Sequence, residues 1–341
     1  MKNNFAKYLT SFFTEYLSGE RGVSSHTIRS YSNTFTLLLN YMDEVKHIRA
    51  DKLIFDHITR QVVIDFLDWL QNNKKCGNNT RNQRLAALHA FFKYMQYEDV
   101  QHLQQWQDIL SIKIKKLGKR IRINYLTVGG IKLLMEQIPT TNKMVRRDLS
   151  MIALLYDSGA RVQELIDLTP VSLHLNPPCY VTLFGKGNKK RLVPLQDRQV
   201  LLLQNYMKEN GLDKPCYNQR PLFANNRGMK LTNAGVTYIL KQYASNARQV
   251  NPELIPDRIS PHSLRHSKAM HLLQAGVNLV YIRDILGHVS IQTTEVYARA
   301  DSKLKREALE AAYINILPAN TSEASWENDS QLKVWLKGLG K

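Results

Sequence analysis

Apolar residues recur three and four positions apart along most of the first 110 residues, which is the spacing of amphipathic helices. The first stripe ends near Gly19 and Gly22, and Ser24 or Ser25 can cap a second helix. Thr59 begins a third helix, the polar stretch 74–79 interrupts it, and a fourth helix runs from about 80 to 94. The stripes consist of Phe5, Tyr8, Leu9, Phe12, Phe13, Tyr16; Ile28, Tyr31, Phe35, Leu38, Leu39, Met42; Val62, Val63, Phe66, Leu67, Leu70; and Leu85, Leu88, Phe91, Phe92. Residues 1–110 are therefore predicted to form a small helical bundle.

The fourth helix opens with polar and basic residues before its apolar stripe begins. Its first turn offers backbone N–H groups beside guanidinium and amide side chains, which suits a phosphate or the edge of a DNA base. The residues expected to make such contacts are Thr80, Arg81, Asn82 and Arg84. The alternative is an ordinary solvated first turn with no partner.

Residues 111–124 alternate isoleucine with lysine around Gly118, a pattern that favours an extended connector over a helix. The segment holds no acidic residue, and its six basic residues are Lys113, Lys115, Lys116, Lys119, Arg120 and Arg122. A basic extended linker can follow a nucleic-acid backbone. We therefore expect 111–124 to be an interdomain linker that contacts phosphates.

After Thr127 the pattern predicts a second, mixed domain over 125–313, with a tail over 314–341. Helical spacing through 149–157 is followed by two β-rich runs, 179–184 and 191–195, on either side of a Gly- and Asn-rich turn. Such a pair predicts a β-hairpin, and helical patterns resume to about Tyr313. The expected fold class is thus mainly α with a small β-sheet.

Composition narrows the class of protein. No apolar run approaches the ~20 residues needed to cross a bilayer, and the first residues lack the apolar core of a secretory signal. Cys76, Cys179 and Cys216 lie far apart without a CxxC pair, which argues against a disulfide framework or a structural zinc site and favours the reducing cytoplasm.

Charge points to a partner class. The chain has 47 Lys and Arg against 29 Asp and Glu, a net charge of +18. Residues 1–110 hold 13 basic and 11 acidic residues, so the remaining 231 residues carry +16 of that surplus. A polyanionic partner explains the excess, and general solubility is the alternative.

Several residues whose side chains could bind a phosphodiester or attack it occur in order along the second domain. They stand in the segments Gly-Ala-Arg161-x-x-Glu164-Leu, Gly-Lys186-Gly-Asn-Lys, His262-x-x-Arg265-His and Leu-Gly-His288, with Tyr297 nine residues further on. In order and spacing these segments resemble the catalytic domain of the tyrosine recombinases, also called the phage integrase family. The helical first domain more weakly resembles the core-binding, SAM-like domain of the Xer and integrase branch.

The resemblance implies a metal-free transesterification in which no cofactor takes part. Arg161 and Arg265 would grip the non-bridging oxygens, Tyr297 would attack the phosphorus, and Lys186 would protonate the leaving oxygen. His262 and His288 would hydrogen-bond the phosphate or assist proton transfer, and Glu164 would orient the cations. Metal ligation by His262, His266, His271 and His288 is the alternative, although the segments lack the paired carboxylates that a two-metal nuclease needs.

Other basic residues have less specific expected roles. Lys189, Lys190 and Arg191, beside Lys186, are expected to contact DNA, whereas His266 and His271 are expected to be packing or surface residues. The tail 314–341 is expected to dock on a neighbouring subunit or to regulate the active site.

The resemblance also implies the assembly. A Xer-like or transposon-type enzyme would close on double-stranded DNA as a C-shaped clamp, recombine sites with inverted core-binding elements in a homotetramer, and be monomeric or weakly associated without DNA. It would act at the nucleoid. The alternatives are a catalytically inactive DNA-binding protein of the same fold and a relaxing enzyme of the type IB topoisomerase kind.

Overall fold

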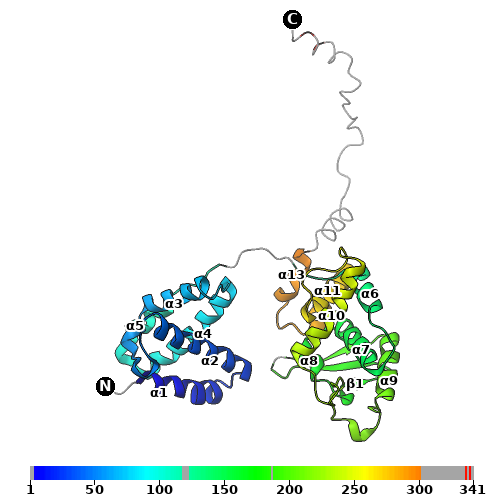
Figure 1. Cartoon of the computed structure of the whole chain (residues 1–341), viewed down its shortest axis with the longest axis horizontal. Coiled ribbons are helices and arrows are strands. Elements are labelled where there is room, and N and C mark those ends of the chain that lie inside the picture. Colours follow the sequence, from blue (N-terminus) through cyan, green and yellow to red (C-terminus); the bar gives the residue numbers. More distant parts are fainter. Residues whose placement is uncertain (1–3, 117–122, 186, 301–334, 336–337, 339–341) are drawn as a thin grey trace. The chain divides into compact units, whose positions relative to one another are not determined.

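The computed structural model describes residues 4–116, 123–185, 187–300, 335 and 338, and it divides into two compact units. We call them the N-terminal unit, Met1–Arg120, and the C-terminal unit, Ile121–Lys341. Figure 1 labels the elements of both units along the chain.

All the regular elements in the described part of the N-terminal unit are helical. Ser24 and Thr59 cap α2 and α3 by accepting backbone N–H groups, as the sequence predicted. The first predicted helix continues as a π-helix after its opening turns. The main elements are α1 Asn4–Ser11, η1 Phe12–Glu20, α2 Ser25–Glu44, α3 Arg60–Asn72, α4 Asn78–Glu98 and α5 Leu103–Leu110.

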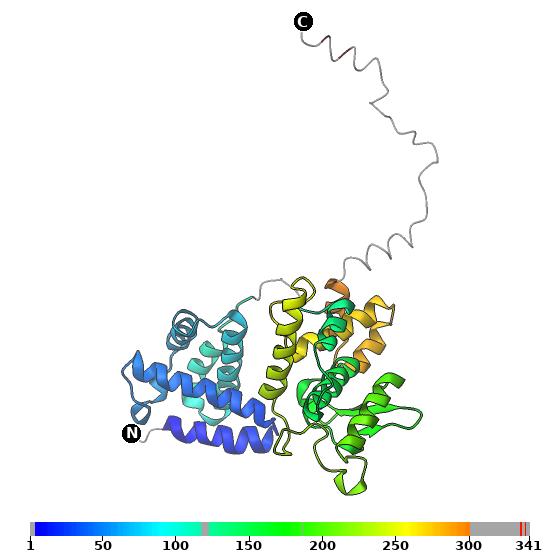
Figure 2. The ribbon, with the colours of Figure 1, turned by 45° about the vertical axis from the view of Figure 1, so that its right-hand side comes forward.

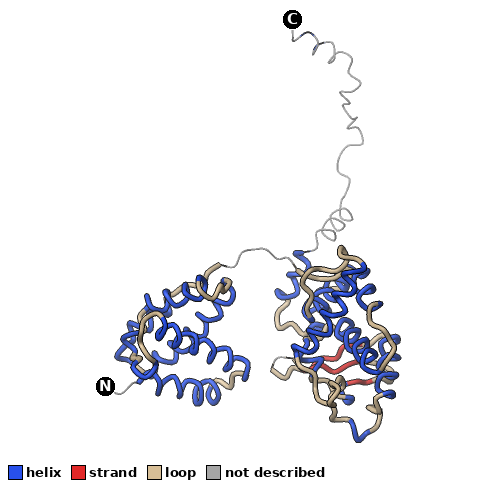
Figure 3. Tube along the Cα trace, viewed as in Figure 1, coloured by secondary structure: helices blue, strands red, loops and turns tan. Residues whose placement is uncertain are grey.

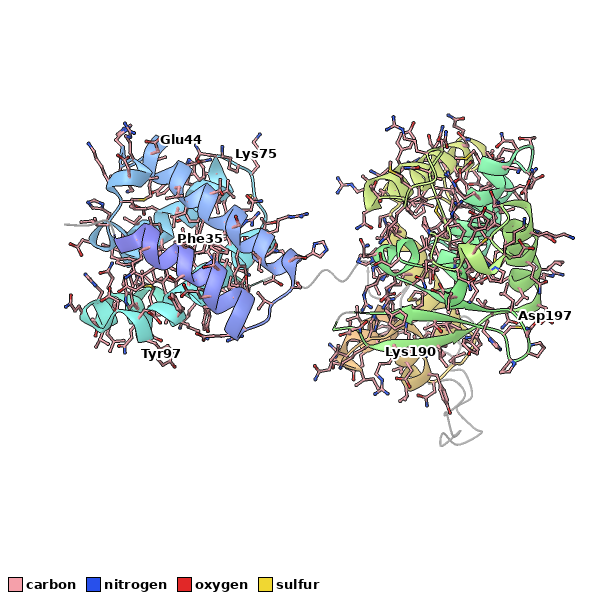
Figure 4. The ribbon with its side chains drawn as sticks, turned by 90° about the horizontal axis from the view of Figure 1, so that it is seen from below. Phe35, Glu44, Lys75, Tyr97, Lys190 and Asp197 are labelled. Atoms are coloured by element: carbon pink, nitrogen blue, oxygen red, sulfur yellow. The ribbon has the colours of Figure 1, made fainter. Side chains whose placement is uncertain are left out.

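Aromatic side chains form the core of this unit. Phe12 contacts Phe35 and Phe91 edge to face, with ring centroids 6.3 and 5.2 Å apart, and Figure 4 shows the side chains of this unit around Phe35. The apolar spacing predicted four helices and did not predict α5, whose Trp106 is fully buried against Phe92. The predicted helical bundle is confirmed, with one helix more than expected (Figure 2).

The C-terminal unit combines helices with one small sheet, so the predicted fold class is confirmed. Figure 3 shows its strands among helices. The helices are α6 Val128–Glu136, α7 Lys143–Ser158, α8 Val162–Ile166, α9 Asp197–Glu209, α10 Asn233–Val250, α11 Pro261–Gln274, α12 Leu279–Leu286 and α13 Gln292–Ala300.

The sheet contains the predicted hairpin. Strands β2 Tyr180–Phe184 and β3 Lys190–Pro194 pair antiparallel, with Val181 opposite Val193. A two-residue strand, β1 Leu173–His174, adds to β2 and was not predicted because two residues leave no alternation to detect. The hairpin turn holds Gly185, Lys186 and Gly187, of which Lys186 lies outside the described residues.

Two apolar clusters support this unit. The larger surrounds the sheet and α7, and the smaller joins α11 and α12 to Tyr297 of α13 through Ala269, Met270, Ile282 and Leu286. Within the described part of the chain, no helix is long and apolar enough to span a membrane.

Candidate active site

Arg161 stands where α7 ends and α8 begins. Gly159 closes α7 with a left-handed backbone, φ +57°, which residues with a Cβ rarely adopt. Arg161 is then the N-cap of α8, and its Nη1 donates to Glu164 Oε1 at 2.8 Å. The Arg161 side chain stays 34% exposed, so its guanidinium can reach a ligand.

Helix α11 supplies three further side chains. Ser260 caps it and Pro261 occupies its first turn, which fixes where the helix starts. Arg265 is only 3% exposed, and it donates to the carbonyl oxygens of Gly159 at 2.6 Å and Leu286 at 2.5 Å. Burial, together with Arg161 and Arg191, lowers the pKa of Arg265 to about 10, so it remains a cation near neutral pH.

Tyr297 of α13 is 3% exposed and lies against two imidazoles. Its hydroxyl is hydrogen-bonded to Nδ1 of His266 at 2.9 Å, and its ring is parallel to that of His288 with centroids 6.4 Å apart. His288 Nδ1 is in turn hydrogen-bonded to Thr294 Oγ1 at 2.9 Å, which fixes its ring. His262 lies one turn before His266, with ring centroids 6.0 Å apart.

Burial and the two guanidiniums set the protonation states. Desolvation, followed by the charges of Arg265 and Arg161, lowers the pKa of His288 to about 4 and also lowers that of His262. The pKa of His266 is lowered by burial, then by His262 and Arg265. Burial raises the pKa of Tyr297, while Arg265 and Arg161 oppose this. Near neutral pH the site therefore combines neutral imidazoles, a protonated phenol and cationic guanidiniums.

Glu164 is buried and stays ionised. Desolvation would raise its pKa, but hydrogen bonds from Arg191 and Arg161 lower it to about 2. Arg191 of β3 holds it with two bonds, from Nη1 to Oε1 at 2.9 Å and from Nη2 to Oε2 at 2.6 Å. The expected orienting role of Glu164 remains a proposal, and the structure brings it into contact with Arg161.

Arg191 corrects one expectation. We expected it to contact DNA with Lys189 and Lys190, and both lysines are exposed; Lys190 is labelled in Figure 4. The Arg191 side chain is only 10% exposed, because β3 turns it inward onto Glu164. Residues that alternate along a strand point to opposite faces, and this places Arg191 inside.

The start of α4 also differs from expectation. Arg81 is 4% exposed, and Arg84 donates to Ser30 O and to Thr34 Oγ1. The amide of Asn82 accepts from Lys115 N at 3.0 Å and donates to Lys115 O at 2.8 Å. Asn82 and Arg84 therefore hold the bundle and the start of the linker together. Within the described residues, Nε and Nη1 of Arg81 are buried without a hydrogen-bond partner, and Thr80 is half-buried.

The linker is described only in part. Lys113, Lys115 and Lys116 are exposed, and Lys115 Nζ contacts Asp68 and Gln71 at 3.3 and 2.6 Å. Lys119, Arg120 and Arg122 lie outside the described residues, as does Lys186. Apart from Trp335 and Gly338, the predicted tail 314–341 does too.

Two features of the site were not predicted from the sequence. His266 was expected to be a packing residue, yet it binds the Tyr297 hydroxyl; its position directly after Arg265 was the available signal. A cleft of about 960 Å³ opens beside His262 and His266, and its lining includes the basic residues Lys241, Arg248 and Arg258. Arg248 forms an ion pair with Asp257 at this cleft.

The cysteines and histidines give no metal-binding group within the described ranges. No cluster of three or more His, Cys, Asp or Glu side chains there could hold a metal ion, and Cys76, Cys179 and Cys216 are free thiols.

Sequence comparison decides the family. The profile described as "Phage integrase family" matches residues 124–303, and that described as "Phage integrase, N-terminal SAM-like domain" matches residues 11–99. This chain belongs to the phage integrase family, the tyrosine recombinases. It is an enzyme of DNA recombination, as its full set of family segments indicates.

Relatives and solved structures agree with this assignment. The chain is 32% identical to a putative integrase/recombinase, y4rC, of Sinorhizobium fredii over 98% of both chains, and 30% identical to tyrosine recombinase XerD of Listeria monocytogenes over 84% of this chain and 91% of the other.

Two DNA complexes share the fold of this recombinase. They are a XerH recombinase bound to difH (TM-score 0.64, 24% identity, 82% of this chain and 78% of the other) and the Tn1549 transposon integrase bound to transposon right end DNA (TM-score 0.67, 18% identity, 89% and 98%).

Proposed function

We propose that this recombinase cuts and rejoins double-stranded DNA at specific sites through a covalent 3′-phosphotyrosine on Tyr297. The observation that supports it best is the convergence of Arg161, Arg265, His266 and His288 on one buried phenol. Two guanidiniums beside a nucleophile provide charge where a phosphodiester develops it.

The chemical step transfers two protons and exchanges one ester bond for another. The Tyr297 hydroxyl donates its proton to the neutral Nδ1 of His266 as its oxygen attacks the phosphorus. The bond from phosphorus to the 5′-oxygen breaks, and that oxygen takes a proton from Lys186 to leave as a hydroxyl. Reversal of these steps by a second 5′-hydroxyl rejoins the strand, so the step needs no energy cofactor.

Arg161 and Arg265 bind the non-bridging oxygens in this scheme. Arg265 is fixed by two carbonyl oxygens before DNA arrives, which reduces the rearrangement needed in the transition state. His262 and His288, neutral near pH 7, donate hydrogen bonds to the same phosphate. No step uses a metal ion.

The cleft at α10 is the surface we propose for the DNA backbone. It adjoins His262 and His266, and Lys241 and Arg258 give it a net positive charge, since Arg248 is paired with Asp257. We further propose that the N-terminal unit and the basic linker close with it as a clamp on duplex DNA at the nucleoid. Two duplexes with inverted core-binding elements would then be held in a homotetramer and exchange strands through a Holliday junction.

Strand exchange tests this function. Two marked duplexes carrying the site, incubated with the protein, should give recombinant duplexes. Binding without covalent adducts would indicate a catalytically inactive DNA-binding protein, and relaxation of supercoiled DNA without recombinants would indicate a topoisomerase-like enzyme.

A further inference from the structure

Three arginines meet the last three carbonyl groups before His288. Arg191 Nε donates to Ile285 O at 2.9 Å, Arg265 Nη2 to Leu286 O at 2.5 Å and Arg161 Nη2 to Gly287 O at 3.3 Å. These carbonyls are at the C-terminal end of α12, where a helix leaves them without intrahelical partners and concentrates negative charge. We call Ile285, Leu286 and Gly287 the α12 end.

Arg191 already donates three of its five N–H groups to the protein. Nε binds the α12 end, and Nη1 and Nη2 bind the two oxygens of Glu164. The approach is close: a Cβ added at Gly287 would lie 3.0 Å from Arg191 Cδ and Nη1. The side chain therefore fits between Glu164 and the α12 end.

Glu164 links Arg191 to Arg161. Its Oε1 accepts from both Arg191 and Arg161, and its Oε2 accepts from the Arg161 backbone at 2.7 Å. Because Glu164 is buried, its negative charge is stabilised only by Arg161 and Arg191 among its ion pairs in the described residues. Removal of either arginine leaves the buried carboxylate poorly compensated.

We propose that Arg191 is a positioning residue of this recombinase: through Glu164 and Ile285 it fixes both Arg161 and the chain that leads into His288. The inference rests on the proposed function for its catalytic consequence, whereas the positioning itself is a property of the DNA-free protein. A phosphate contact by Arg191, as the sequence suggested, is the competing role.

The two roles separate in the Arg191→Gln variant of the full chain. Positioning predicts that single-turnover cleavage of a nicked duplex slows about 10- to 100-fold, as for other residues that orient reactive groups. It also predicts that DNA affinity and its salt dependence stay unchanged, whereas loss of a phosphate contact lowers the salt slope by about 1. A lowered slope with unchanged cleavage would overturn the proposal.

Arg147→Gln is the matched control. Arg147 is another buried arginine of the same unit, bound to Asp148 and to Ala224 O. Its loss should lower the melting temperature without slowing cleavage by the folded protein. Arg191→Lys keeps the charge but not the two-point grip on Glu164, so it should recover part of the rate. It also provides a test if Arg191→Gln folds poorly.

A readout that needs no catalysis completes the experiment. In protein labelled with ¹⁵N-histidine, Arg191→Gln or Arg191→Lys should shift the ring signals of His288 and leave those of His271, which binds Tyr156, in place. Unmoved His288 signals in both variants would refute positioning. If the wild type forms no DNA adduct while His288 still shifts, the proposed function fails and the positioning role stands.

Discussion

At the scale of single residues, the proposed chemistry depends most on the contact between His266 and Tyr297. Burial lowers the pKa of His266 and raises that of Tyr297. The protonated phenol is therefore a suitable proton donor and the neutral imidazole a suitable acceptor. Such a pair can pass a proton only while the imidazole is neutral.

His266→Gln should slow single-turnover cleavage by about 100-fold or more, because general base catalysis commonly contributes that much. DNA affinity should not change. His271→Gln, on the same helix but bound to Tyr156, is the control and should cleave normally. Cleavage at the wild-type rate in His266→Gln would remove this residue from the mechanism.

Stability should depend on pH through His288. Its pKa is about 4 in the folded protein against an ordinary value of 6.5, so between these pH values the unfolded chain binds more protons. Stability therefore rises with pH across this window and is lost as pH falls from 6.5 toward 4. As the pH falls through this window, the melting temperature of His288→Gln should decrease less than that of the wild type. Equal decreases would contradict the partial burial of His288.

At the scale of elements, the resemblance to the family predicted which side chains gather but not which way some of their neighbours face. Arg161, His262, Arg265, His288 and Tyr297 stand in segments whose order resembles the family, and the structure brings them together. The inward turn of Arg191 depends on strand register, and that of Arg81 on the packing of α4. Both positions do lie on the buried face by spacing, because Arg191 alternates with Leu192 before the buried Val193 and Arg81 lies four residues before the buried Leu85. Their charge favoured a solvent-exposed position, and it outweighed this signal in the prediction.

Substitution of Gly287 directly tests the contact between Arg191 and the α12 end. Gly287→Ala places a Cβ at φ +64° and 3.0 Å from Arg191, which should cost about 1–2 kcal/mol in backbone strain and displace Arg191 as well. Gly276→Ala has a similar φ, +79°, with nothing within 4 Å of the added Cβ. Both variants should melt earlier, measured by calorimetry, but only Gly287→Ala should also slow cleavage. Equal cleavage rates would show that the close approach has no catalytic consequence.

At the scale of the whole molecule, charge is distributed for DNA. The N-terminal 110 residues are almost balanced at +2, while the linker and the remaining chain carry +16. Composition thus predicted a polyanionic partner, but it could not show that Asn82 holds the backbone of Lys115 and so fixes where the linker leaves the bundle.

Neutralising the linker should flatten the salt dependence of binding. Replacing Lys113, Lys115, Lys116, Lys119, Arg120 and Arg122 by Gln removes up to six phosphate contacts, each contributing about 0.9 to the logarithmic slope. Lys208→Gln with Lys214→Gln, both exposed, is the control for charge alone. An unchanged slope in titrations from 50 to 200 mM salt, roughly the range over which such effects are large, would show that the linker does not follow the backbone.

The covalent intermediate on Tyr297 tests the central claim most directly. When a duplex is nicked next to the cleavage point, cleavage releases a short fragment that carries the 5′-hydroxyl, and the strand cannot be rejoined. The protein should therefore remain joined to the DNA and migrate as an adduct. Mass spectrometry of the digested adduct should place the phosphodiester on the peptide containing Tyr297, and Tyr297→Phe should bind the same duplex without forming the adduct. An adduct on another residue, or one that persists in Tyr297→Phe, would contradict the mechanism.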